Sequence, residues 1–351
     1  MRSRFFTLIF LVFVFSCTAQ KPIQIQSLNL HEGHVLLLPD SADAARIIVT
    51  DRTDLFFERV TAAEMSIQMK RSLKAGQSRD ELLPAFLDYL RHDVENFTPA
   101  ESVYVAEVMQ EVFNTCQAVV PGIFPDTLIM LKTKGNHYGA SVYYTRENYI
   151  IIPADVLGAA MRRQFTSTMY HELFHVYSRL NPKKRELLYR LIGFETIGLA
   201  NLRLPEALAA RVLHNPDGVD FAQKITLNTE DGKTIDAVPV IYANQTGFQP
   251  DQREFFGYVE FNLFQIEKTP EGAWQVLAKD DGYTSLLDLK TLPDFFRQIK
   301  DNTGYIIHPD EVLADNFAFL MQGKSNPKIT ARFSAEGKQL IENIEKTLKE
   351  D

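Results

Sequence analysis

Apolar residues recur at every third or fourth position in one central segment of the chain. The positions are Phe165, Met169, Leu173, Val176 and Leu180. Residues at this spacing share one face of a helix, so the pattern predicts an amphipathic helix with one buried stripe. Asn181-Pro182 then ends the segment, because a residue before proline disfavours the helical conformation.

Other segments show the same periodicity. Thr98-Pro99-Ala100-Glu101 has the form of a capping box with proline at the first helical position, and it predicts a long helix to about residue 118. Pro309 is a second good helix start. Further helices are predicted over residues 61–72, 81–91, 185–192, 205–213, 285–300 and 335–349, with a break near Pro293.

Alternating apolar residues and turn signals predict strands between these helices. The expected strands are residues 35–38, 46–49, 126–133, 140–144, 149–152, 225–229, 233–242, 258–266 and 273–278. The pattern therefore predicts an α+β fold, with an N-terminal α/β part over residues 31–95 and a β-rich block over 215–280. The strands predicted over 140–144 and 149–152 form a hairpin just before the central helix. Its edge either binds an extended peptide, or the hairpin is purely structural.

The first residues resemble an export signal. Two arginines precede an apolar run over residues 5–15, which is too short to span a membrane stably. Val14-Phe15-Ser16-Cys17 resembles a bacterial lipoprotein cleavage box, which implies a lipid on Cys17; ordinary cleavage after Ala19 is the alternative. We therefore expect a signal peptide over 1–16, a polar tether over 17–30 and one domain over 31–351, exported and held to the membrane only by the lipid.

Composition narrows the possible partners. The 351 residues are 45% hydrophobic and 23% charged, which is ordinary for a globular protein. The formal net charge of −8 gives no indication of a nucleic-acid partner. The other cysteine, Cys116, lies in a largely apolar helical stretch and is expected to be a buried, inert thiol.

The central helix also contains the sequence H-E-x-x-H. His171 and His175 are four positions apart, so both imidazoles project from one face, where one Zn²⁺ can bind both. Glu172 follows the first histidine, and its carboxylate can take a proton from an attacking water. A surface helix with two unrelated histidines is the plain alternative.

A catalytic zinc site needs a third protein ligand. Glu311 and Asp315 form an E-x-x-x-D pair at helical spacing, so Glu311 can bind the metal while Asp315 accepts a hydrogen bond from the outer nitrogen of His171. Glu195 and Glu206 are the competing ligands. Glu195 has no acid four residues later, and Glu206 stands at a helix start where an acid is expected for capping alone.

These motifs resemble the gluzincin clan of zinc metallopeptidases. His171-Glu172-x-x-His175 followed by Glu311-x-x-x-Asp315 resembles the clan's two motif helices, and residues 311–317 resemble the E-x-x-A-[DE]-x-F helix of lethal-factor-type members. The wider segment resembles secreted zinc-peptidase lipoproteins of bacteria. The resemblance covers about two helices. It implies a zincin-like catalytic core, one Zn²⁺ per chain and a peptide or protein substrate. In compact gluzincins the two motif helices are nearly consecutive, whereas a long interval separates His175 from Glu311 here. The β-rich block therefore has to be an insertion between the two helices.

The same resemblance implies the catalytic roles. Glu172 acts as the general base for hydrolysis of a peptide bond, and a tyrosine shortly before the glutamate helix, here Tyr305, donates to the oxyanion. His308 is the local alternative for that donor. Two other functions fit the sequence: an envelope protein that binds or supports a partner, and a zinc hydrolase of a non-peptide amide. Intact Glu172 argues against a purely structural zinc site.

Overall fold

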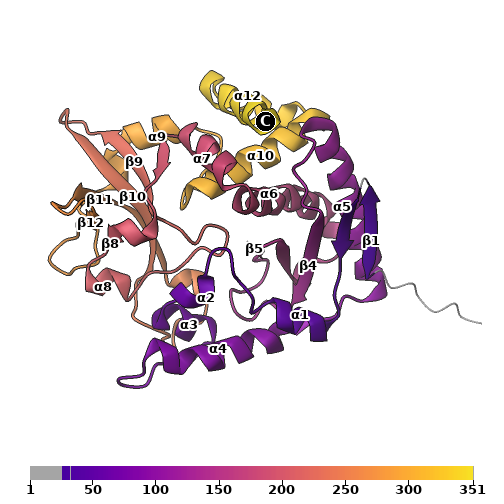
Figure 1. Cartoon of the computed structure of the whole chain (residues 1–351), viewed down its shortest axis with the longest axis horizontal. Helices are drawn as coiled ribbons and strands as arrows, with labels where there is room; N and C mark the ends of the chain where they lie inside the picture. Colours follow the sequence, from indigo (N-terminus) through magenta and orange to yellow (C-terminus); the bar gives the residue numbers. More distant parts are fainter. Residues whose placement is uncertain (1–25, 32, 351) are drawn as a thin grey trace, which may run out of the picture.

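Two six-stranded sheets lie at opposite ends of the molecule, with helices between and around them (Figure 1). The computed structural model describes residues 26–31 and 33–350. The α+β class predicted from the sequence is confirmed. The predicted signal peptide over 1–16 and the predicted lipidation site Cys17 lie outside the described residues.

The first sheet has the strand order β1-β2-β4-β6-β5, with β3 also pairing with β4. The central strands β2, β4 and β6 are parallel, and both outer pairs are antiparallel. The strand bounds are β1 Ser27–His31, β2 His34–Leu37, β3 Val94–Glu95, β4 Thr127–Thr133, β5 Tyr144–Arg146 and β6 Tyr149–Pro153.

Helices cover both faces of this sheet. On β4, Leu128 and Met130 pack into the core beneath α5 (Pro99–Val119), while Leu131 packs into a second core formed with α4 (Arg79–Asp93). Successive side chains of a strand point to opposite faces, so a strand buried on both faces reads as continuously apolar. Three shorter helices accompany α4: α1 Ser41–Ile47, α2 Phe56–Arg59 and α3 Ala62–Gln68.

The helix α6 (Arg162–Leu180) crosses the middle of the molecule and packs against α10 (Pro309–Ser325). Four of the five predicted stripe residues of α6 are buried, but Leu180 is exposed at the last helical position. The helices α7 (Pro182–Arg190) and α12 (Ala335–Lys349) also pack against α10, and α11 (Lys328–Ala331) follows it.

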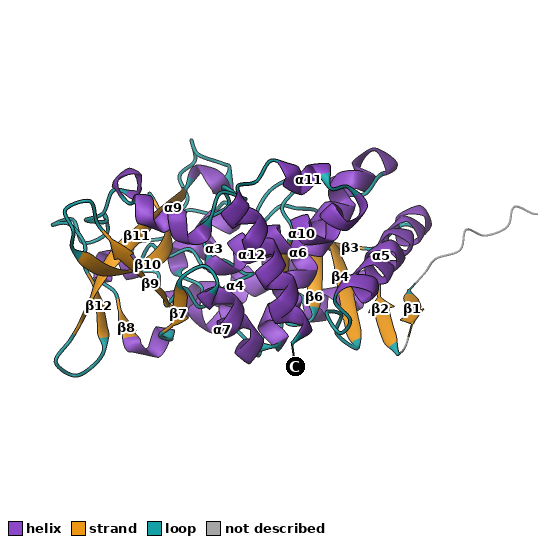
Figure 2. Ribbon diagram, turned by 90° about the horizontal axis from the view of Figure 1, so that it is seen from above, coloured by secondary structure: helices purple, strands orange, loops and turns teal. Residues whose placement is uncertain are grey.

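The second sheet has the order β7-β9-β10-β11-β12-β8. Seen from above, it lies at the end of the molecule opposite the first sheet (Figure 2). The strand bounds are β7 Phe194–Thr196, β8 Leu202–Arg203, β9 Gln223–Asn228, β10 Thr234–Ala243, β11 Val259–Lys268 and β12 Trp274–Val276; α8 is Glu206–Ala209 and α9 is Pro293–Ile299. The sheet thus begins before the predicted 215–280 block, because two short strands from residues 194–203 join its edges.

Some predicted elements are wrong. Residues 46–49 are predicted as a strand, but residues 46 and 47 form the end of α1. Asp40 stabilises this helix at its start by accepting hydrogen bonds from two backbone N–H groups. Residues 27–30 belong to β1 and not to a tether, because they pair with β2. Residues 140–143 form a turn and irregular backbone before β5, and the predicted helix over 285–300 is α-helical only within α9.

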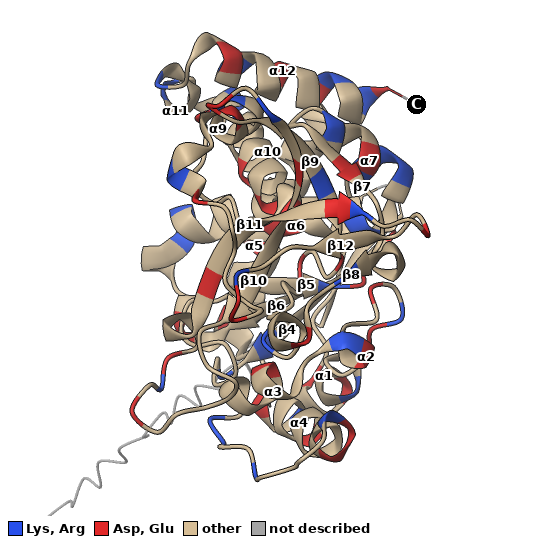
Figure 3. Ribbon diagram, turned by 90° about the vertical axis from the view of Figure 1, so that its left-hand side faces the viewer, with Lys and Arg blue, Asp and Glu red and all other residues tan. Residues whose placement is uncertain are grey.

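In the part of the chain that the structure describes, no helix combines the length and apolar character needed to cross a bilayer. Acidic and basic segments are interspersed along α12 and α7 (Figure 3).

Candidate metal centre

Three side chains from α6 and α10 converge where these helices cross. His171 and His175 lie one turn apart, with ring centroids separated by 4.7 Å. Glu311 lies in the first turn of α10 and is buried. Its Oε2 atom lies 3.0 Å from His171 Nε2 and 3.3 Å from His175 Nε2. Within the described residues, this is the group whose ligand atoms fall within 4.8 Å of one another.

The spacing and chemistry of these atoms fit a zinc ion. Ligand atoms about 2.0–2.2 Å from a tetrahedral zinc are roughly 3.3–3.6 Å apart, close to the two distances to Glu311. His175 Nε2 is buried and makes no hydrogen bond within the described chain. A buried polar atom without a hydrogen bond is costly, and a cation held between the three residues would satisfy it.

Carboxylates fix the outer nitrogen of each histidine. His171 Nδ1 donates to Asp315 Oδ1 at 2.9 Å, and His175 Nδ1 donates to Asp310 Oδ2 at 2.7 Å. These bonds select the tautomer whose Nε2 lone pair faces the cluster. The hydrogen bond from His171 to Asp315 is the one predicted from the E-x-x-x-D spacing.

Each supporting carboxylate is itself anchored. Asp310 Oδ1 accepts hydrogen bonds from Ser178 Oγ at 2.5 Å and from the Tyr189 hydroxyl at 2.9 Å. Thr303 Oγ1 donates to the other oxygen of Asp315. Asp310 has its side chain almost wholly buried, whereas that of Asp315 is 26% exposed.

The electrostatics of the cluster favour a cation. Burial disfavours the charged form of His171, but hydrogen bonds to Asp315 and Glu311 outweigh it and raise its pKa to about 10. Burial raises the pKa of Glu311, yet the charge of His175 and the hydrogen bond from His171 hold it well below its usual range. Without a metal, protons on the two histidines balance the negative charge of the carboxylates. A divalent cation can replace these protons.

Glu172 faces the same cluster with a free carboxylate oxygen. Its side chain is buried, and its Oε2 makes no hydrogen bond within the described chain. Burial, followed by the negative charge of Asp217, raises the pKa of Glu172 to about 8. A carboxylate with its pKa near neutrality is suited to accepting and returning a proton.

A loop from the β-rich block completes the site. Asn215 Nδ2 donates to Glu311 Oε1 at 2.6 Å, and Asp217 Oδ1 accepts from the backbone and hydroxyl of Thr145 at 2.6 and 2.7 Å. In the sequence, Asn215-Pro216-Asp217-Gly218 stands only at the start of the predicted β-rich block. These are ordinary turn residues, so nothing in the sequence pattern indicates their role.

The role of Asp310 was also not predicted from the sequence. It lies in the first turn of α10, where an acid is expected at any helix start. Only the packing of α10 against α6 reveals that it supports His175.

The two predicted oxyanion donors have different surroundings. Tyr305 lines the cleft, and its ring stacks near His171, with centroids 6.1 Å apart and an interplanar angle of 22°. Although Tyr305 as a residue is 42% exposed, the protein that surrounds its hydroxyl, then the charge of Glu311, raises its pKa well above the usual value, so the hydroxyl keeps a proton to donate.

His308 is not among the residues that line the cleft. Both of its ring nitrogens also hold hydrogen bonds within the protein, so neither is free to donate to an oxyanion. Its Nδ1 accepts from the backbone N–H of Asp310, which caps α10, and its Nε2 donates to the carbonyl of Asp220. His308 therefore fastens the loop of the β-rich block to the start of α10.

The competing third ligands lie elsewhere. Glu195 is on β7, where its side chain is 65% exposed and 3.7 Å from the ammonium of Lys224. Glu206 begins the short helix α8 and is exposed. The structure brings only Glu311 of these three glutamates to the histidines.

The edge of β5 is already occupied. The backbone N–H of Thr145 donates to Asp217, and its carbonyl accepts from Arg179 Nη2 at 3.5 Å. Of the two interpretations of the hairpin, this geometry favours a structural one at β5.

The candidate centre opens into a cleft with a volume of ≈ 450 Å³. Its walls come from the turn before β5, from α6 and α10, and from Phe256 in the β-rich block. Comparisons with protein-family models, curated proteins and solved structures found no match. The functional argument therefore depends on the geometry of the centre.

Proposed function

We propose that the chain is a zinc-dependent peptidase whose ligands are His171, His175 and Glu311. The observation that carries this proposal is the convergence of three ligand atoms beside the unpartnered carboxylate oxygen of Glu172, at the bottom of an open cleft. Three protein ligands leave one position open, which distinguishes a catalytic zinc site from a closed structural one.

When bound, zinc supplies Lewis-acid chemistry that acidifies water and polarises a carbonyl group. Glu172 removes a proton from the attacking water and then gives it to the leaving amine nitrogen, so that the peptide C–N bond breaks as the new C–O bond forms. The Tyr305 hydroxyl donates a hydrogen bond to the carbonyl oxygen as its negative charge develops. Asp310 and Asp315 keep the two imidazoles oriented throughout.

The proposal extends to the location of the protein. The resemblance of residues 1–16 to a lipoprotein signal, with Cys17 as the acylated residue, supports an exported enzyme held at the bacterial envelope by its lipid. Its substrate is then a peptide or protein of that compartment.

The test combines metal content with hydrolysis. Purified protein starting after Cys17 should bind one zinc per chain by elemental analysis and should cleave a mixed peptide library. Glu172→Gln should retain the zinc and lose at least about 100-fold of the rate, in line with removal of a general base. Glu195→Ala serves as the matched control and should retain both zinc and rate.

Two results would refute the proposal. Wild-type protein that binds no zinc after reconstitution has no metal centre. Protein that binds zinc but cleaves no peptide is a binding module or a hydrolase of another amide.

A further inference from the structure

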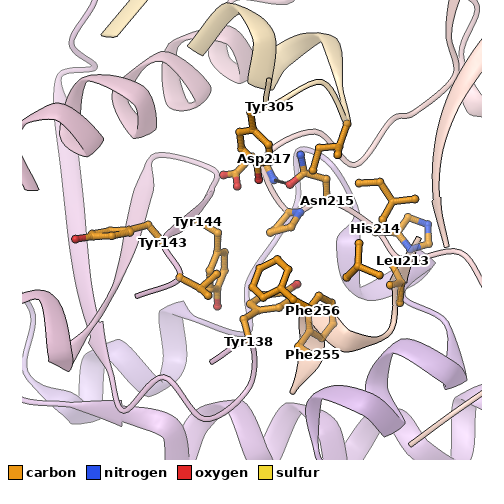
Figure 4. Close-up of a pocket in the computed structure, with 15 residues that line it drawn as sticks. Tyr138, Tyr143, Tyr144, Leu213, His214, Asn215, Asp217, Phe255, Phe256 and Tyr305 are labelled. Carbon is orange, nitrogen blue, oxygen red and sulfur yellow. Dashed lines mark hydrogen bonds between the residues drawn. The ribbon is translucent and has the colours of Figure 1, made fainter. Parts of the chain in front are cut away.

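A second cavity lies beside the cleft of the candidate metal centre, and Figure 4 shows the residues that line it. It shares five lining residues with the cleft: Val142, Tyr143, Asp217, Phe256 and Tyr305. In the close-up, Tyr305 lies on one side of this cavity, and the pair Phe255 and Phe256 lies on the other. The cavity and the cleft therefore adjoin at these shared residues.

The cavity is lined mostly by apolar and aromatic side chains. Those beyond the shared residues include Tyr138, Tyr144, Leu213, Ile241, Phe255, Val259 and Ile307. They come from β5 and the turn before it, from the loop at 213–217, from β10 and β11 with the 3₁₀ turn Phe255–Gly257, and from the segment before α10, so the β-rich block supplies much of the wall.

Several polar groups of the wall are already engaged within the protein. Asn215 donates to Glu311, and both the backbone and the ring of His214 contact Glu64 Oε2, at 3.0 and 3.3 Å. The Tyr144 hydroxyl donates to His137 Nε2 at 2.9 Å. The buried hydroxyls of Tyr138 and Tyr143 make no hydrogen bond within the described chain, but most of the lining side chains are apolar or aromatic, which favours an apolar occupant.

The size of the cavity suits a single side chain. Its volume is ≈ 70 Å³, whereas one water needs roughly 10–15 Å³ by a comparable measure. A cavity of about 150 Å³ holds a benzene ring, so this space takes only the end of a large apolar side chain, with the remainder of that side chain against the mouth.

The mouth carries two exposed aromatic rings. Phe256 is 60% exposed and Tyr305 is 42% exposed. Phe255 supports this rim from below, with its ring edge-on to Phe256 at 5.6 Å and to Tyr138 at 4.9 Å. Exposed apolar groups beside a formed cavity mark a surface that a ligand covers.

We propose that this cavity is a specificity pocket that receives one bulky apolar side chain of a polypeptide substrate, close to the bond that is cleaved. The proposal rests on the proposed peptidase function and adds to it a substrate class: chains with Leu-like or Phe-like residues beside the scissile bond. Asp217 lies at the junction of the pocket and the cleft, so acidic side chains are excluded by charge repulsion.

Binding tests this pocket without depending on turnover. Zinc-loaded Glu172→Gln protein is titrated with fluorescently labelled peptides, blocked at both ends, of the form Ala-Ala-X-Ala-Ala, where X is Phe, Leu, Ala, Lys or Glu. Partial burial of a large apolar side chain predicts that the Phe and Leu peptides bind about 10-fold more tightly than the Ala peptide.

Two further substitutions in the Glu172→Gln background locate the effect. Val259→Trp should fill the pocket and Phe256→Ala should remove its rim, so each should reduce the preference for Phe over Ala at least about fivefold. Phe296→Ala is the matched control, because Phe296 is another exposed phenylalanine, 43% exposed on α9, and should leave the preference unchanged. Zinc content of one per chain checks that each variant keeps its site.

Equal affinities for all five peptides, absence of binding by any of them, or tightest binding of the Lys or Glu peptide would overturn the pocket assignment. So would a preference for Phe that survives Val259→Trp. The proposed function fails by a different result, absence of peptide cleavage by the zinc-loaded wild type, and the binding series can be interpreted in either case.

Discussion

Asp310 is the residue whose role depends most on its neighbours. It joins His175 on one oxygen to Ser178 and Tyr189 on the other, so the imidazole is held by a fully anchored carboxylate. An acid that fixes the tautomer and orientation of a metal-binding histidine raises the metal affinity of the site.

We expect Asp310→Asn to weaken zinc binding about 10- to 100-fold, because the amide cannot accept from His175 and from both hydroxyls as the carboxylate does. Competition with a chromophoric chelator measures this loss. Asp315→Asn should have the smaller effect, since Asp315 is partly solvated. A larger loss in Asp315→Asn would contradict this ranking.

Glycine is required at position 218 because the loop backbone there lies close against the ring of His308. A Cβ atom at this position would lie 2.4 Å from His308 Cε1, so any side chain would push the loop away from the start of α10. We expect Gly218→Ala to displace Asn215 from Glu311 and to lower zinc affinity at least about tenfold.

Gly158→Ala is the control for this glycine prediction, because a Cβ there meets nothing within 4 Å and the backbone is extended. Zinc affinity of the two variants, measured side by side, distinguishes a steric effect at the loop from a general cost of replacing glycine. Equal affinities would show that the loop does not support the centre.

At the scale of elements, the start of α5 is fixed by a capping box and by a lysine from the neighbouring sheet. Thr98 and Glu101 exchange both bonds of the box, and Lys132 Nζ, on β4, lies 3.0 Å from Glu101 Oε2. Burial raises the pKa of Glu101, but the hydrogen bond from the backbone of Thr98 and the interactions with Lys132 lower it below its usual value. The box therefore stabilises the ionised form.

We expect Glu101→Gln to lower the free energy of unfolding by about 1–2 kcal/mol at pH 7. The folded-state pKa lies below the unfolded value, so this stabilisation is present above the unfolded pKa of about 4.3 and is lost as the pH falls through the folded pKa. Urea unfolding of metal-free protein between pH 7 and pH 3.5 measures both effects.

Glu107→Gln on the same helix is the control for the capping prediction. Glu107 is 61% exposed, and within the described chain it pairs with the exposed Arg162, so its loss should cost less than about 0.5 kcal/mol. A difference between wild type and Glu101→Gln that persists at the lowest pH would contradict the ionic explanation.

At the scale of the whole molecule, the candidate centre joins two helices that are far apart in the chain. His171 and His175 belong to α6, Glu311 belongs to α10, and the second sheet is inserted between them. A ligand that binds only the folded state stabilises it in proportion to the logarithm of its concentration relative to Kd.

Zinc at about 100 times its Kd should therefore stabilise the protein by about 2.7 kcal/mol, seen as a higher thermal midpoint that a chelator reverses. Glu311→Ala should show little or no such shift, while Glu195→Ala should shift as the wild type does. A shift in Glu311→Ala equal to that of the wild type would place the metal elsewhere.

The local patterns predicted much of the fold. The capping box at Thr98, the stripe of α6, the stop at Asn181-Pro182 and the hairpin between β9 and β10 were all identified correctly, because each depends on residues close in sequence. The exposed end of α6 at Leu180, the helix α1 and the extra edge strands β7 and β8 were not, because neighbouring elements decide their burial or pairing.

The sequence by itself determined which residues could form a metal centre. The helical spacing of His171 and His175, and of Glu311 and Asp315, is a property of the α-helix and needs no tertiary information. Tertiary structure alone decided that Glu311 and not Glu195 reaches the histidines, that Asp310 and Asn215 support them, and that an apolar pocket opens beside them. Each of these depends on packing between segments distant in sequence, which local propensity and spacing do not encode.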